Sequence, residues 1–132
     1  MQFINPSTLN DPSSYGFTQI VAIPVGTSLA YIAGQGGGTT DGRGYSDSFS
    51  DQVDQAFENL RTALAAVGAA PEDVVKITVL SVDHTDEKLR LISAARNSFW
   101  PNQTPASTLI PVPSLASAGM QIEIDAMTVI PQ

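Results

Sequence analysis

The side chain in this sequence best suited to chemistry is a carboxylate placed between two isoleucines. Glu123 lies in the run IEIDA, residues 122–126. Because consecutive side chains of a strand point to opposite faces, Glu123 faces away from Ile122 and Ile124 and shares its side with Asp125. If that side lies in a cleft, Glu123 can accept a proton from a bound water, as a general base does. If it is solvated, Glu123 is an ordinary surface charge, and the sequence leaves both interpretations open.

Other kinds of catalysis find little support. The sequence has no cysteine, which removes disulfides, thiolate metal sites and a cysteine nucleophile. His84 is the only histidine, and we expect it to be solvated at a helix start. Neighbours in an extended chain point opposite ways, which argues against a Ser-His-Asp triad through Ser81. We expect no metal, since zinc needs three or four convergent ligands, and no cofactor, because the run GQGGG matches no nucleotide-binding motif.

Two helices are predicted from hydrophobic periodicity. Apolar residues recur at steps of three and four from 48 to 67, and Gly68 is suited to end that helix in a left-handed conformation. The same spacing returns from 85 to 100, before Pro101. Residues 36–48 are rich in glycine and lack an apolar period, which predicts a loop.

Strands are predicted where β-branched and aromatic residues gather. We expect them at 17–24, 29–35, 71–82 (after an initial turn), 107–115 and 120–130. The first two are separated by VGTS, which favours an antiparallel hairpin. Pro111 and Pro113 indicate that the strand they belong to lies at an edge or is bulged, because proline cannot donate to a sheet ladder.

The predicted order, ββαβαββ, defines an α+β fold, and we expect a single domain over residues 1–132. Two helices can cover only one face of the sheet. The strands carry apolar residues on both faces, so the second face also needs a cover. Another copy of the chain is the most economical cover, and we therefore expect a homo-oligomer.

The charge of the chain argues against polyanionic partners. Thirteen Asp and Glu against six Lys and Arg give a net charge of −7, which repels phosphate backbones and anionic membranes. We expect neither nucleic acid nor a membrane as a partner. No apolar run reaches the roughly 18 residues of a membrane helix, and the first residues lack the order of a signal peptide, so we expect a cytoplasmic location.

Four short motifs are spread along the chain: YGFTQ (15–19), IAGQGG (32–37), PAST (105–108) and IEIDA (122–126). Together with DVVKITVLSVD (73–83), they resemble the RidA/YjgF family, small trimeric proteins of which many hydrolyse reactive enamines and imines. The resemblance covers nearly the whole chain. It implies a chorismate-mutase-like sheet, a barrel-like homotrimer and a small-molecule site in a cleft between subunits.

The resemblance also implies site residues, and they carry over unevenly. Glu123 stands where active members keep an acidic residue near the substrate or its water, which makes it the candidate catalytic residue. Gly34, followed by Gln35, stands where a backbone group faces the site. Phe17 occupies a position where active members commonly have tyrosine, and Ser93 one where many have asparagine.

Ser107 is the departure with the largest consequence, because it replaces the arginine that clamps the substrate carboxylate in the family's deaminases. A guanidinium holds a carboxylate by two charge-assisted hydrogen bonds, which a serine cannot reproduce. Ser107 and Thr108 could instead bond a neutral or amide-like group. Another cation could also take part, and the candidates are Arg43 in the glycine-rich loop and Arg96 at the border of the second helix's buried face.

Two functions remain open from the sequence. The first is a hydrolase of a small imine or enamine that releases ammonia, acting on a substrate other than a simple 2-imino acid. The second is a non-catalytic, ligand-binding or regulatory trimer of the same fold, because a fold does not fix a function.

Overall fold

Strand β4 (Val74–Val82) is the strand around which the sheet is built in the computed structural model, which describes residues 1–39, 41 and 44–132. Its β-branched residues alternate, so that Ile77 and Val79 are completely buried beneath the helices while Lys76 and Thr78 face the other side. The main sheet has the order β3-β6-β4-β5. The other three strands are β3 (Leu29–Gly36), β5 (Ala106–Val112) and β6 (Ile122–Val129). Only β4 and β5 run parallel among these neighbours.

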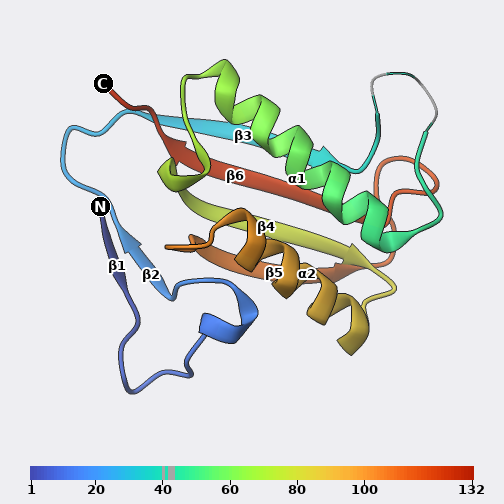
Figure 1. Ribbon diagram of the computed structural model, residues 1–132, viewed down its shortest axis with the longest axis horizontal. Coiled ribbons are helices and arrows are strands. Elements are labelled where there is room, and N and C mark those ends of the chain that lie inside the picture. The colour runs from blue at the N-terminus through green and yellow to red at the C-terminus, as the bar shows by residue number, and fades with distance from the viewer. Residues whose placement is uncertain (40, 42–43) are drawn as a thin grey trace.

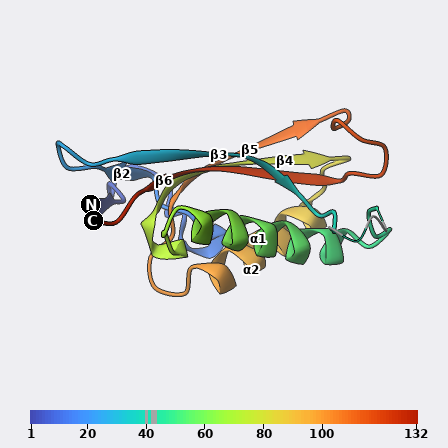
Figure 2. The same ribbon diagram turned by 90° about the horizontal axis from the view of Figure 1, so that it is seen from above.

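Both helices lie against the same face of this sheet (Figure 2). Helix α1 (Phe49–Ala66) begins where the Ser48 side chain accepts a hydrogen bond from the Asp51 amide, and Gly68 follows its end with φ +70°. Helix α2 (Asp86–Phe99) begins where Thr85 accepts one from the Lys88 amide. These bounds confirm the two predicted helices, the α+β class and the placement of both helices on one face.

The core lies between the helices and the sheet and is closed at one end by aromatic rings. Phe57, Phe99 and Trp100 form a cluster with ring centroids 4.7 to 5.9 Å apart. The Trp100 indole N–H donates to the Pro71 carbonyl at 2.7 Å, which satisfies its polar atom inside the core. Leu60 and Ile124 are completely buried in the hydrophobic core to which these three rings belong.

The predicted hairpin of residues 17–24 and 29–35 is wrong. Strand β2 (Ile20–Ala22) pairs with β1 (Gln2–Ile4) in a separate two-stranded sheet, while β3 pairs with β6 (Figure 1). The local VGTS turn favoured a hairpin, but β6 gives β3 a longer partner whose alternate residues are buried beneath the helices. Residues 5–12 and 113–121 contain no strand, and Ser13–Tyr15 and Pro71–Asp73 form single 3₁₀ turns.

The edges of the main sheet are β3 and β5. The edge position of β5, which carries Pro111, confirms the prediction made from its prolines. The face opposite the helices has no cover from within the described residues, and Figure 2 shows it as the outer side of the sheet. Tyr31 on this sheet is 76% exposed and Ile110 is 43% exposed.

Leu60→Ala tests the core between α1 and the sheet. We expect it to lower the free energy of unfolding by about 2 to 5 kcal/mol, because it leaves a cavity at a completely buried position. Leu9→Ala, the same change at a leucine that is 51% exposed, is the control and should cost less than about 0.5 kcal/mol. Chemical denaturation measures both, and equal losses would contradict this description of the core.

Candidate functional site

Glu123 lies on the open face of the sheet, directly over Gly34. Ile122 and Ile124 on either side of it are completely buried under the helices, so Glu123 must point the opposite way. The register between β3 and β6 shifts between Ile32 and Gln35, and Gly34 lies inside this irregularity. A side-chain carbon at Gly34 would overlap the Glu123 carboxylate, so the glycine provides the space that the carboxylate occupies.

A lysine and a second carboxylate share this open face. The Lys76 ammonium donates to the Thr108 hydroxyl at 2.8 Å and to the Ile77 carbonyl at 2.9 Å. Burial lowers the pKa of Lys76, and the nearby Asp125 carboxylate partly offsets that effect. Asp125 accepts a hydrogen bond from the Thr78 amide at 3.1 Å. Gly34, Lys76 and Asp125 line a shallow hollow of about 500 Å³.

The second group of predicted residues meets on the helix side of the sheet, around a buried guanidinium. Arg96 on α2 is 2% exposed. Its Nη1 donates to the Ser107 hydroxyl at 2.9 Å, and its Nη2 donates to the Ser93 hydroxyl at 3.4 Å. The Phe17 ring centroid lies 5.7 Å from the guanidinium carbon. Burial lowers the pKa of Arg96 to about 10, so the side chain remains charged at neutral pH.

The chain segment that contains Phe17 covers Arg96 because it is fastened to the start of β5. Gly16, with φ +77°, passes so close to α2 that a side-chain carbon there would lie 2.8 Å from the Arg96 Cβ. The Thr18 amide then donates to the Pro105 carbonyl at 2.8 Å, and the Thr18 hydroxyl donates to the Thr104 carbonyl at 2.6 Å. Phe17 is thereby held between α2 and the beginning of β5.

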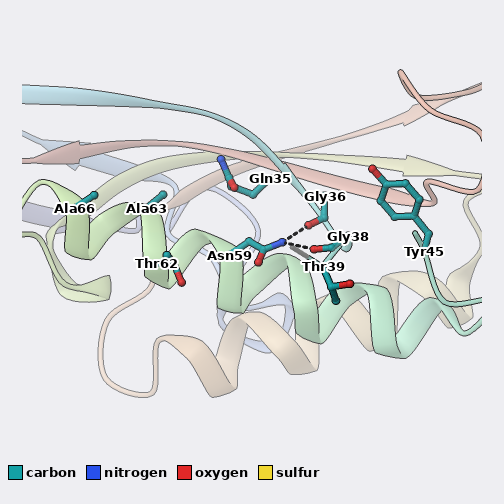
Figure 3. Close-up of a pocket in the computed structure, with 9 residues that line it drawn as sticks. All are labelled: Gln35, Gly36, Gly38, Thr39, Tyr45, Asn59, Thr62, Ala63 and Ala66. Carbon is teal, nitrogen blue, oxygen red and sulfur yellow. Dashed lines mark hydrogen bonds between the residues drawn. The ribbon is translucent and has the colours of Figure 1, made fainter. Parts of the chain in front are cut away.

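Gln35 belongs to neither group. It lines a pocket of about 530 Å³ between β3 and α1 (Figure 3). Its side-chain amide donates to the Ala33 carbonyl at 2.9 Å. Asn59 on α1 donates to the carbonyls of Gly36 and Gly38 at 2.8 and 2.9 Å, which Figure 3 draws as dashed lines. Asn59 therefore fixes the end of β3, a role that the helical periodicity of the sequence did not indicate.

The structure thus divides the predicted site residues between two faces of the sheet. Phe17, Ser93, Arg96 and Ser107 come together on the helix side. Gly34, Thr108 and Glu123 lie on or toward the open face, where Thr108 contacts Lys76. The sequence analysis did not single out Lys76, although a lysine inside a β-branched strand was a usable signal. Arg43 lies outside the described residues.

The expectation that His84 is solvated at a helix start holds only in part, since His84 directly precedes the helix cap Thr85 but is not fully solvated. His84 is half-buried, and its Nδ1 lies 2.9 Å from the Ser81 hydroxyl. The argument from extended neighbours failed because the strand ends at Val82 and Asp83 adopts φ +48°, which turns the chain back toward Ser81. Ser81 is completely buried, so a substrate cannot reach its hydroxyl as a nucleophile.

Within residues 1–39, 41 and 44–132, no group of three or more histidine, aspartate or glutamate side chains is placed to hold a metal ion. Over the same residues, no helix combines the length and the apolar content needed to cross a membrane.

The fold is that of an α+β protein in which two helices cover one face of a four-stranded sheet. Residues 9–130 match the family described as Endoribonuclease L-PSP. The RutC family protein YjgH of Escherichia coli K12 is 31% identical over 104 residues, which cover 79% of this chain and 77% of that protein. The chain therefore belongs to this family, known also as the RidA/YjgF or Rid family.

Solved structures agree with this assignment. A Rid family protein of unknown function, YyfB from Yersinia pestis, superposes with a TM-score of 0.91 at 29% identity and 97% coverage of both chains. RidA from the Antarctic bacterium Psychrobacter sp. PAMC 21119 gives a TM-score of 0.71 at 26% identity, with 86% of this chain and 87% of that chain covered. The family resemblance read from the sequence is confirmed.

Gly34→Ala tests whether this glycine exists to make room for Glu123. We expect the added methyl group to push the carboxylate aside, at a cost in unfolding free energy of about 1 to 3 kcal/mol. In a Glu123→Ala background the obstructing atoms are absent, so the same glycine change should cost markedly less. Denaturation of the four proteins in this cycle measures the coupling. An equal cost in both backgrounds would show that Gly34 is required for another reason.

Proposed function

We propose that the chain is a hydrolase of a small imine or enamine, active as a homotrimer in a cleft between subunits. The observation that carries the proposal is the Glu123 carboxylate. It is half-buried over Gly34 and makes no hydrogen bond or ion pair to any side chain that the structure describes. A carboxylate with free oxygens in a partly dry place is suited to hold and deprotonate a water. Membership of a family with imine-hydrolysing members supports the same reaction.

The proposed reaction requires one general base and a correctly oriented water molecule. Water adds to the carbon of a protonated imine while Glu123 accepts the proton that the water loses. The resulting carbinolamine carries both oxygen and nitrogen on one carbon. After Glu123 returns the proton to the nitrogen, the carbon–nitrogen bond breaks and ammonia leaves. The Glu123 carboxylate then accepts the hydroxyl proton, and a carbonyl product remains. The cleft mainly has to orient the water against the imine carbon.

A non-catalytic, ligand-binding trimer is the second candidate. The observation that favours it is Ser107, which stands where the family's deaminases carry their carboxylate-clamping arginine. A cleft that has lost this clamp can still bind a small molecule without turning it over. Cleavage of RNA, which the family description suggests, fits poorly with a net charge of −7.

Glu123→Gln separates catalysis from binding, because it preserves the shape of the side chain and abolishes its basicity. With an imine generated in situ as substrate, we expect the rate of ammonia release to fall by about a hundredfold or more. Asp125→Asn is the matched control, since Asp125 lies on the same strand and face but bonds the Thr78 amide. It should retain most of the activity. Unchanged turnover in Glu123→Gln would overturn the proposed role of this residue.

The assembly is testable separately. The open face of the sheet carries exposed Tyr31 and Ile110, and burying such a surface against other copies is favourable. Sedimentation at micromolar concentration should give three times the 13.9 kDa mass of the chain. A single species with the mass of the monomer would exclude a cleft between subunits and this form of the proposal.

A further inference from the structure

Lys76 is an amine that the fold holds in one place on the open face of the sheet. It is half-buried on β4, and its Nζ donates to the Thr108 hydroxyl at 2.8 Å and to the Ile77 carbonyl at 2.9 Å. Among residues 1–39, 41 and 44–132, no carboxylate forms an ion pair with it. The proposed hydrolysis does not use this amine. Lysines that are fixed and partly desolvated are suited to act as nucleophiles toward carbonyl compounds.

The two hydrogen bonds leave one direction of the Lys76 nitrogen free. An ammonium group has three N–H bonds, and two of them are used by the Thr108 hydroxyl and the Ile77 carbonyl. When the third proton passes to water, the lone pair takes its place and is directed away from both acceptors. Burial lowers the pKa of Lys76, with a partial offset from Asp125, so this proton leaves more readily than it would from a solvated lysine.

The hollow beside Lys76 suits a small ligand without a negative charge. Tyr31 and Met127 line this space of about 500 Å³ together with Lys76, and they offer apolar surface to an alkyl group. Asp125 lines the same hollow and is exposed, so its carboxylate repels anions. The hollow therefore favours a short, uncharged molecule whose reactive carbon can lie against the Lys76 nitrogen.

We propose that Lys76 forms a reversible imine with small uncharged aldehydes and ketones that enter this hollow. The free amine attacks the carbonyl carbon, a proton moves from nitrogen to oxygen, and a carbinolamine forms. Its hydroxyl then takes a proton from the solvent and leaves as water, which gives a protonated imine without any oxidation or reduction.

This inference goes beyond the proposed hydrolysis, because it holds whether or not Glu123 acts as a base. The two sites are nevertheless close to each other. Gly34, over which Glu123 lies, lines the same hollow as Lys76. A carbonyl product released beside Glu123 therefore belongs to the class of molecules that Lys76 captures.

Lys88 is the matched control, since it is the other lysine of the chain. Its Nζ donates to the Val82 carbonyl at 2.6 Å and lies 4.7 Å from the centroid of the Phe49 ring. The face of an aromatic ring attracts a cation, so this arrangement favours the protonated amine, which is not nucleophilic. We therefore expect Lys88 to react with aldehydes more slowly than Lys76.

Propanal with sodium cyanoborohydride tests the proposal, because the reductant converts an imine into a stable secondary amine. Peptide mass spectrometry of the full chain should find the propyl group on Lys76 while Lys88 is still unmodified. Lys76→Arg should lose this early adduct, and Lys88→Arg should retain it. In guanidinium chloride the two lysines should react at similar rates, because the preference comes from the fold. Without the reductant, dialysis should restore the original mass.

Several results would overturn the inference. Equal reaction rates of the two lysines in the folded chain would show that Lys76 is an ordinary surface amine. Modification of Lys76 only in denaturant would show that neighbouring copies of the chain close the hollow. An adduct that survives dialysis without reduction would not be an imine. Turnover separates this site from the proposed function. An adduct on Lys76 without ammonia release from any imine would remove the hydrolase and leave the lysine site, whereas ammonia release without the adduct would do the reverse.

Discussion

The alternation of side chains along β4 and β6 divides the molecule into a sealed side and an open side. Ile77, Val79, Ile122 and Ile124 occupy inward positions on these strands and pack in the core between one face of the sheet and the helices α1 and α2. The outward positions between them therefore receive the polar groups, including Lys76 and Glu123. A shift of one residue in the register of either strand would exchange the apolar and polar side chains between the two faces and bury the charges. Burial of the apolar residues therefore also fixes the face on which Lys76 and Glu123 lie.

The sequence was sufficient for features that depend on residues close together in the chain. Both helices and the left-handed Gly68 after the first of them follow from local spacing and local conformational preference. Strand pairing was harder to predict, because β3 joins β6 from the far end of the chain and no local signal competes with the apparent hairpin. The contact between His84 and Ser81 was missed for a related reason. The positive φ of Asp83 reverses the direction that the side chain would have in an extended chain.

The candidate site combines both kinds of information. The position of Glu123 follows from the isoleucines around it, but the need for Gly34 beneath it became apparent only when β3 and β6 were paired. Arg96 and Ser107 are 11 residues apart in the sequence and are brought together by the return of the chain from α2 to β5. The departure at Ser107 is therefore linked physically to a cation on another element, a relation that comparing single positions does not reveal.

The edges of the sheet have a consequence for the behaviour of the protein in crowded solution. A strand with unpaired backbone groups is a template on which further chains can stack into fibrils. Here β5 carries Pro111, which has no amide hydrogen to offer, and Thr18 already bridges its first residue, Ala106. These features interrupt the edge at two points. The β5 edge of the sheet is thus protected against fibril formation, although no helix covers it.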